Sequence, residues 1–514
     1  MRRSKPAVVR PADPAAETDR PAAAPPHLRS ASPWSQAFHA YMREGWQRPA
    51  RRKVPPVPGR PFIGRRRQAL CRAFAGELLV IPTGHEKVRA NDTFYPFRPG
   101  SDFYYLTGCL EPDCVLVLDV DAAGKGRPTL FVEGNLGHAT DAFYADRDKG
   151  ELWVGPRLSV EQSAQRFGLS DCRPLAGLND WLAERLAGRA WRMVRGLDPA
   201  LERHCDAAAR RQKRGQAGED RQRQRDVRLA GHLSEMRLVK DAHEVAALKS
   251  ACRATARGFD DVIERLAVGQ SEREVEGIFN LRARVEGNAV GYNTIAAAGH
   301  HACTLHWSQN DGPLRRGDLL LLDAGVEGNE LYTADVTRTL PLSGRFSEPQ
   351  REIYELVLAA QAAGFRAVKP GNDFMAANEA AMQVLAHGLE RLGILEDAER
   401  DLLPDRQLYR RYTLHMVSHM LGLDVHDCAS ARSQAYKFGK LEPGMVLTVE
   451  PGLYFQKDDL TVPKRYRGIG VRIEDDLLVT ARGHQVLSRL PRAPREVEHW
   501  MQSVWRQTGG RRRR

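Results

Sequence analysis

The chain has 514 residues, of which 42% are hydrophobic and 28% charged, an ordinary balance for a globular protein with a buried core. Its formal net charge is +12, but the excess lies at the two ends: residues 1–60 hold twelve Lys and Arg against four Asp and Glu, and Arg511–Arg514 add four more. The sequence between these ends is nearly neutral, so we expect no nucleic-acid-binding face and no nucleic acid among the partners.

The composition also indicates a cytoplasmic location. No run approaches the ~18 uninterrupted apolar residues that a membrane helix needs, so we expect no membrane association. The eight cysteines are scattered and form no CxxC pair, which is typical of reduced thiols. Arg2 and Arg3 resemble a twin-arginine start, but proline, alanine and charged residues follow in place of an apolar segment, and we expect no signal peptide.

The two ends of the chain are predicted to be tails. Residues 1–57 are rich in Pro, Ala and Arg, and such a segment buries too little apolar surface to offset the entropy lost on ordering. We expect disorder there, apart from a short helix around 34–46. Residues 503–514 are predicted to form a basic C-terminal tail.

A first, smaller α/β domain is predicted over 58–232. Apolar runs favour buried strands, and they alternate with helical patterns, at 78–82, 114–120, 129–132 and 178–187. The basic stretch 210–228 is expected to form a surface helix or a connection to the next domain.

A second domain is predicted over 233–502. Its helices begin with capping-box patterns, in which an N-cap residue is followed three residues later by Glu or Gln, at Asp241, Ser271 and Ser347. Four strands are expected between and after these helices, at 319–323, 331–342, 445–450 and 469–480. Helices followed by paired strands, in two rounds, favour an α+β domain with an antiparallel sheet.

Four acidic residues lie in or at the end of these apolar strands. In chain order they are Asp323, Asp335, Glu450 and Glu474, and Arg472 shares a strand face with Glu474 because side chains alternate along a strand. A single buried acid costs several kcal/mol or becomes neutral. Any one of the four could be a salt-bridge or turn residue, but four together would repel unless cations balance them.

Histidines follow the same segments. His415 and His419 have the spacing of two zinc ligands on a helix, but Met416 stands where such a motif requires Glu, which excludes the simple zincin site. His306 and His426 are further candidates, although a lone histidine is more often structural. Oxygen ligands suit Mn, Mg or Co, and a histidine among them favours a transition metal.

Five segments, in this order, resemble the pita-bread metallopeptidases, and the aminopeptidase P branch most closely. They are LLDAG at Asp323, TADVTRTLP at Asp335, SHMLGLDVHD at His419, LTVEPGLY at Glu450 and GVRIEDD at Glu474. The stretch 91–108 resembles the N-terminal domain of the same branch. The resemblance therefore implies a C-terminal pita-bread, creatinase-like catalytic domain preceded by a smaller α/β domain.

The resemblance also implies roles for individual residues. The expected ligands of two divalent ions are Asp323, Asp335, His419, Glu450 and Glu474, with Asp335 and Glu474 shared between the ions. His306, His415 and His426 would lie on the substrate side, and Arg472 would stand behind the ligands. Manganese is the expected metal, with cobalt or zinc as alternatives.

The spacing between the first two aspartates departs from the family pattern. Twelve positions separate Asp323 from Asp335, where eleven are usual, and the turn-type pair Gly328-Asn329 lies between them. We expect the extra residue in a longer hairpin tip or a bulge. A slipped register would turn Asp335 to the opposite face of the hairpin and remove the site.

The resemblance implies a metallo-aminopeptidase that hydrolyses the N-terminal Xaa-Pro bond of peptides, and the expected pair of ions would supply a metal-bound hydroxide for it. Glu450 would transfer protons, His426 would contact the carbonyl oxygen, and His306 and His415 would shape the proline pocket. The alternatives are a prolidase, which splits Xaa-Pro dipeptides, and a non-catalytic pita-bread binding module. The family also implies a homodimer or homotetramer.

Overall fold

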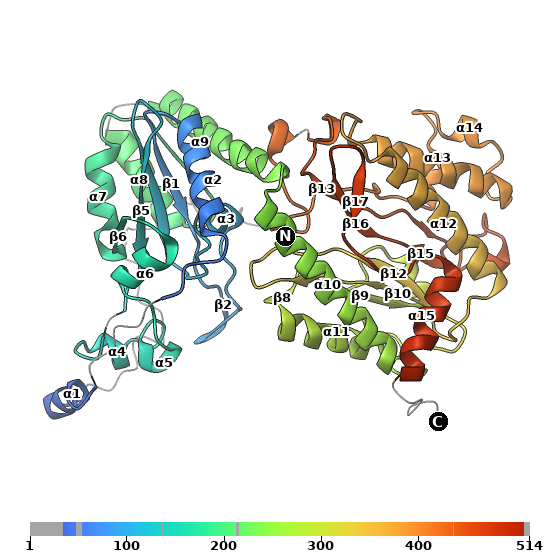
Figure 1. The fold of residues 1–514 in the computed structure, drawn as a ribbon, viewed down its shortest axis with the longest axis horizontal. Helices are drawn as coiled ribbons and strands as arrows, with labels where there is room; N and C mark the ends of the chain where they lie inside the picture. The colour runs from blue at the N-terminus through green and yellow to red at the C-terminus, as the bar shows by residue number, and fades with distance from the viewer. Residues whose placement is uncertain (1–33, 48–53, 136, 212–214, 435, 508–514) are drawn as a thin grey trace, which may run out of the picture.

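The computed structural model describes residues 34–47, 54–135, 137–211, 215–434 and 436–507. Most of the predicted N-terminal tail and residues 508–514 of the predicted C-terminal tail lie outside these ranges. The helix expected around 34–46 is present as α1 (Gln36–Arg43). Figure 1 shows two bodies joined by the long helix α9 (Gly215–Leu238), which passes the predicted boundary at 232.

The first body is built on a five-stranded mixed sheet of order β6-β5-β4-β1-β7. Its strands are β1 (Leu78–Pro82), β4 (Val115–Val120), β5 (Gly126–Val132), β6 (Asp171–Pro174) and β7 (Trp191–Met193). Alternate residues of β1 face opposite cores, since Leu79 packs in the cluster that includes Leu70 whereas Val80 packs in the cluster that includes Trp181.

Helices cover both faces of this sheet, as the α/β prediction requires (Figure 1). They are α2 (Arg60–Ala73), α3 (Ser101–Thr107), α6 (Val160–Phe167), α7 (Leu178–Leu186) and α8 (Pro199–Arg211). The small elements β2 (Val88–Ala90), β3 (Thr93–Phe94), α4 (Ala142–Ala145) and α5 (Glu151–Val154) belong to this body, and α1 packs on α4 through the rings of Phe38 and Tyr144.

The second body contains two rounds of helices and antiparallel strands, which confirms the predicted α+β class. The first round comprises α10 (Ala242–Arg265), α11 (Glu272–Glu286), β8 (Ala289–Val290), β9 (Ile295–Ala298), β10 (Leu319–Asp323), β11 (Val326–Glu327) and β12 (Thr337–Pro341). The second comprises α12 (Glu348–Ala367), α13 (Ala376–Arg391), α14 (Ala398–Asp401), β13 (Val446–Val449), β14 (Gly452–Tyr454), β15 (Gly470–Arg472), β16 (Asp475–Val479) and β17 (His484–Val486). The last helix, α15 (Pro494–Gln507), continues past residue 502, where the catalytic domain was predicted to end.

The predicted helix starts are present. Asp241, Ser271 and Ser347 each cap a helix through a complete capping box, so the local sequence alone fixes where α10, α11 and α12 begin. Two strand predictions were too long. The segment expected at 331–342 is a strand only from Thr337, and the one expected at 469–480 is interrupted at 473–474.

The hairpin between Asp323 and Asp335 explains the first of these differences. Asp323 pairs with Thr337, and the antiparallel register continues without a shift to the bridge between Glu327 and Thr333. The turn then closes at Gly328–Leu331, where Leu331 adopts a left-handed φ of 61°. The longer spacing is therefore accommodated at the hairpin tip. Residues 323 and 335 remain on the same face because Asp335 lies two positions from Thr337, which pairs directly with Asp323.

The two bodies contact each other close to the segment that carries His419. Arg98 of the first body donates through Nη2 to the carbonyl oxygen of Leu423 at 2.6 Å and through Nε to Glu327 at 2.7 Å. Arg237, at the end of α9, forms ion pairs with both Asp102 and Asp427. The loop at 423–427 is thus held by both bodies.

Candidate metal centre and active site

One cavity of about 740 Å³ in the second body contains every site residue that the sequence predicts. Nine of the residues that line it are the predicted ones, namely Asp323, Asp335, His306, His415, His419, His426, Glu450, Arg472 and Glu474. They come from six separate segments of the chain, so the fold brings together residues up to 168 positions apart, from His306 to Glu474.

Strand ends position the acids. Asp323 is the last residue of β10, Glu450 directly follows β13, and Glu474 lies in the short break between β15 and β16. His419 is placed by the same sheet, because its N–H donates to Thr448 Oγ1 at 3.2 Å and its carbonyl accepts from the Thr448 N–H at 3.0 Å. The segment around His415 and His419 is not helical, so their spacing does not place them on one helix face.

The predicted ligands lie within reach of a shared cation. His419 Nε2 is 3.2 Å from Asp335 Oδ2 and 3.5 Å from Glu450 Oε1. Asp335, His419 and Glu474 each offer one ligand atom, and these three atoms all lie within 4.8 Å of one another. This grouping of oxygen atoms with one imidazole nitrogen suits a transition-metal ion.

The ends of the cluster are fixed by neutral and cationic donors. Asp323 accepts from the Tyr292 hydroxyl at 2.7 Å and from Arg472 Nη2 at 2.6 Å. Glu474 accepts from the Thr337 hydroxyl at 2.7 Å. These contacts use one lone pair on each oxygen of Asp323 and one on Oε2 of Glu474, and they fix both carboxylates while leaving acceptor capacity for a metal ion.

Crowding of the acids perturbs their protonation. Burial, reinforced by neighbouring carboxylates, raises the pKa of Asp323 and Glu474, and it raises the pKa of Glu450 to about 8. Burial alone would lower the pKa of His419, but the hydrogen bond with Asp335 and the charge of Glu450 reverse this effect and raise it to about 9. Two divalent ions would relieve this repulsion, so the residues present fit a pair of metal ions.

Comparison with known proteins agrees with this geometry. Residues 246–481 match the model of metallopeptidase family M24, and residues 63–194 match that of the aminopeptidase P N-terminal domain. The chain is 49% identical over 468 residues to Xaa-Pro aminopeptidase 1 of Streptomyces coelicolor, which covers 90% of this chain and 91% of that protein. The chain belongs to the aminopeptidase P family.

Solved structures of the aminopeptidase P family have the same fold. The structure of Proline aminopeptidase P II from Yersinia pestis matches with a TM-score of 0.77 and 34% identity over 86% of this chain and 99% of that one. Aminopeptidase P from Escherichia coli, in its low-pH form, matches with a TM-score of 0.77 and 33% identity over 87% and 98% of the two chains. These matches confirm the predicted fold class and its two-domain order.

Membership of the aminopeptidase P family makes the chain a hydrolase that binds divalent metal, as predicted. The helices within the described ranges include none that is long and apolar enough to cross a membrane.

Three histidines besides His419 line the cavity next to the cluster of acids. His415 Nε2 lies 2.7 Å from the Tyr454 hydroxyl, and burial together with the charge of Arg472 lowers the pKa of His415 to about 4, so it is neutral at pH 7. His426 packs edge-on against His419, with ring centroids 4.3 Å apart. Both side chains face the cavity alongside His306.

Three polar residues at this aminopeptidase P site were not predicted from the sequence. Thr337 follows Asp335 by two positions, so strand periodicity could have placed it on the same face. Tyr454, which accepts from Arg472 Nη1 at 2.9 Å, belongs to the LTVEPGLY segment and could have been found there. Tyr292 lies in a short connection between two strands, and no sequence pattern marks it.

Proposed function

We propose that this chain is an Xaa-Pro aminopeptidase that removes an N-terminal residue preceding proline, with two divalent ions in the cavity. The observation that carries this proposal is the convergence of five predicted ligands and three histidines on one cavity. Relatives that share 33–49% identity with the chain are Xaa-Pro aminopeptidases, which supports the substrate class.

The ions would be held by Asp323, Asp335, His419, Glu450 and Glu474. Asp335 and Glu474 belong to the group of three residues whose ligand atoms all lie within 4.8 Å of one another, which supports a shared position between the two ions. When bound, the ions supply a water molecule of lowered pKa and polarise the scissile carbonyl. Manganese is our first candidate, and cobalt or zinc are the alternatives.

Glu450 is our candidate for proton transfer. Its Oε1 lies 3.5 Å from His419 Nε2 and its Oε2 lies 3.7 Å from His415 Nδ1, so the carboxylate faces the middle of the cavity. Burial gives Glu450 a pKa of about 8 without metal, which is suited to gaining and losing a proton near neutral pH. It would take a proton from the attacking water and pass one to the departing proline nitrogen.

The histidines would bind the substrate. His426, neighbouring His419 at the cavity wall, would donate to the carbonyl oxygen as negative charge develops there. Neutral His415, held by Tyr454, and His306 would shape the pocket for the proline ring. Arg472 would keep Asp323 in place through the 2.6 Å contact of its Nη2.

We further propose a cytoplasmic homodimer or homotetramer without a nucleic-acid partner. The near-neutral charge of the chain between its basic ends supports the last point. Light scattering and partition between cytosol and membrane fractions test these proposals, and a monomer or a membrane-bound protein would contradict them.

Hydrolysis of a tripeptide Xaa-Pro-Yaa tests the function. We expect release of the first residue with Mn²⁺, loss of activity after chelation, and recovery when Mn²⁺ is returned. Cleavage of the dipeptide Xaa-Pro alone would instead identify a prolidase. The chain would be a non-catalytic binding module if it holds no metal and cleaves neither peptide after Mn²⁺, Co²⁺ or Zn²⁺ is added.

A further inference from the structure

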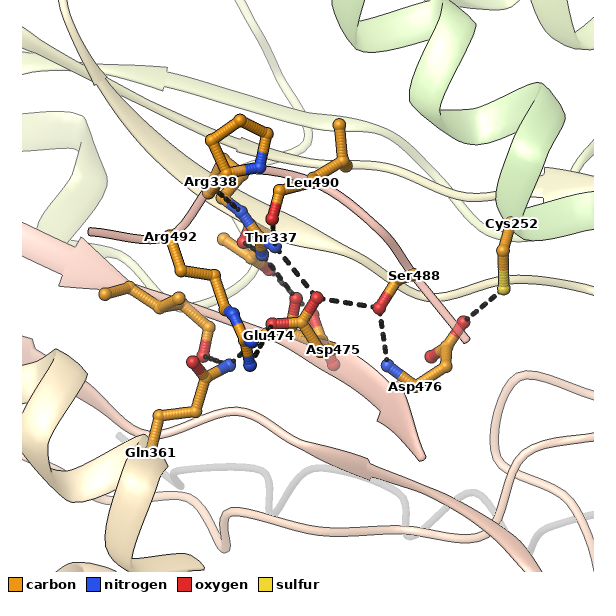
Figure 2. Close-up of polar contacts among 12 residues, drawn as sticks. Cys252, Thr337, Arg338, Gln361, Glu474, Asp475, Asp476, Ser488, Leu490 and Arg492 are labelled. Carbon is orange, nitrogen blue, oxygen red and sulfur yellow. Dashed lines mark hydrogen bonds and ion pairs between the residues drawn. The ribbon is translucent and has the colours of Figure 1, made fainter. Parts of the chain in front are cut away.

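A fully buried arginine, Arg338 of β12, lies beside the backbone of the predicted ligand Glu474 and is 0% exposed (Figure 2). All five of its N–H donors are used. Nε donates to the carbonyl of Pro491 at 2.7 Å, and Nη1 donates to the carbonyls of Thr337 at 2.8 Å and Glu474 at 2.7 Å. Nη2 donates to Asp475 Oδ1 at 2.8 Å and to the carbonyl of Leu490 at 3.1 Å. A single guanidinium thus joins three segments of the domain.

The partner of Arg338 extends this network. Asp475, also 0% exposed, accepts from Arg338 and from the Ser488 hydroxyl at 2.7 Å through Oδ1, and from Gln361 Nε2 at 3.0 Å through Oδ2. Gln361 Nε2 also lies 3.2 Å from the carbonyl oxygen of Ile473 and 3.3 Å from that of Val449. Those two residues immediately precede the predicted ligands Glu474 and Glu450.

A second buried acid connects the network to another ligand. Asp476 Oδ2 accepts from the backbone N–H of Asp335 at 3.1 Å and from Cys252 Sγ at 3.3 Å. The backbone N–H of Asp476 donates to the Ser488 hydroxyl at 3.0 Å. Figure 2 shows how Ser488 lies between the two aspartates and links them.

The network therefore contacts the backbone at or beside three of the five predicted ligands, Asp335, Glu450 and Glu474, and none of its own side chains is a predicted ligand. Metal-ligand geometry depends on the partners that hold the ligands, and loss of such a partner commonly weakens metal affinity ~10–100-fold. Four mutually repelling carboxylates need such restraint, because their backbones would otherwise separate when the metal leaves.

We propose that Arg338 and Asp475 are a positioning pair for the metal centre, which fixes the backbones of the two ligands shared between the ions. The inference rests on the proposed function, since Asp335 and Glu474 must bind metal for the pair to matter. Ser488 then serves as the link that couples the pair to Asp335 through Asp476.

The test compares Arg338→Lys and Ser488→Ala with two controls. Arg338→Lys retains a cation but lacks the planar five-donor geometry, whereas Ser488→Ala removes one hydroxyl and is the milder change if the lysine variant does not fold. Arg282→Lys alters another arginine–aspartate contact in the same domain, and Thr107→Val removes a buried hydroxyl from the first domain.

The measurement is calorimetric titration of the metal-free, full-length proteins with Mn²⁺, with circular dichroism to establish that each is folded. We expect Mn²⁺ affinity to fall about 10–100-fold in Arg338→Lys and by a smaller factor in Ser488→Ala. Both controls should bind Mn²⁺ like the wild type even where their thermal stability falls. A merely structural role would lower stability in the same way without moving the Mn²⁺ affinity.

Two outcomes distinguish a failure of the positioning role from a failure of the proposed peptidase function. The positioning role alone would be overturned if the wild type binds two Mn²⁺ and cleaves Xaa-Pro-Yaa while both variants fold and keep the wild-type Mn²⁺ affinity. Wild-type protein that neither binds Mn²⁺ nor cleaves the peptide would overturn both.

Discussion

Replacing Glu450 with glutamine should change activity and metal-free stability in opposite directions. The substitution preserves the shape of the side chain and removes its charge. A carboxyl that ionises near pH 4.5 in the unfolded chain, but near 8 in the folded one, takes up a proton on folding at pH 7. This uptake costs about 3 kcal/mol.

The sign of this effect follows from the direction of the pKa shift. Because folding raises the pKa of Glu450, its penalty is absent below pH 4.5, grows as the pH rises, and levels off near pH 8. Metal-free Glu450→Gln should therefore be more stable than metal-free wild type by up to about 3 kcal/mol at pH 7, and the two should match at pH 4.5.

Urea unfolding of chelator-treated proteins at pH 4.5 and pH 7 measures this difference, and Glu355→Gln, at an exposed position on α12, is the control. Peptidase assays with saturating Mn²⁺ measure the other half of the prediction. Loss of a proton-transfer group alone lowers turnover ~10²–10⁴-fold. Near-normal turnover, or a metal-free variant less stable than wild type at pH 7, would refute the assignment of Glu450.

Three further outcomes are expected. Mn²⁺ should bind more tightly as pH rises from 6 to 8, because protons compete with the metal for Glu450 and its neighbours. Isothermal titration at a series of pH values measures this, and a Mn²⁺ affinity that does not change with pH would contradict it. His426→Ala should lower kcat/KM by ~10²–10³-fold without changing the circular dichroism spectrum, and unaltered kinetics would exclude His426 from the reaction. His85, whose pKa is raised to about 10 by hydrogen bonds with Asp113 and Asp198, should stabilise the fold below pH 6.5 and lose that effect as pH approaches 10. Its exposure limits the effect to less than ~1 kcal/mol, so His85→Gln should lower the urea midpoint slightly at pH 6 and not at pH 10.5; an equal loss at both would contradict the ion pairs.

The residues that the sequence identified share one property. Each acid of the site ends or interrupts an apolar strand, so its burial could be inferred from its neighbours before any contact was known. Asp323 at the end of four leucines is the clearest example. The capping boxes at Asp241 and Ser271 were predictable for the same reason, because they depend only on residues three positions apart.

What the sequence could not provide are partners that come from distant segments. In the sequence Arg338 is one polar residue of a strand, and its role depends on residues 490–491, which lie far away in the chain. Tyr292 likewise gains a role only through its contact with Asp323. The strand predicted at 331–342 was too long because its apolar residues begin at Leu331, which belongs to the turn, whereas the strand itself begins at Thr337. Periodicity cannot distinguish a buried turn from a strand.

The hydrogen bond from Arg98 to the Leu423 carbonyl means that the first body helps to hold a loop of the candidate site in place. A fragment starting near residue 233 would keep each predicted ligand yet lose both Arg98 and Asp102, and Arg237 would be left with one acid in place of two. Leu423 lies three residues before His426, so the contact from Arg98 supports the chain segment that carries this cavity residue.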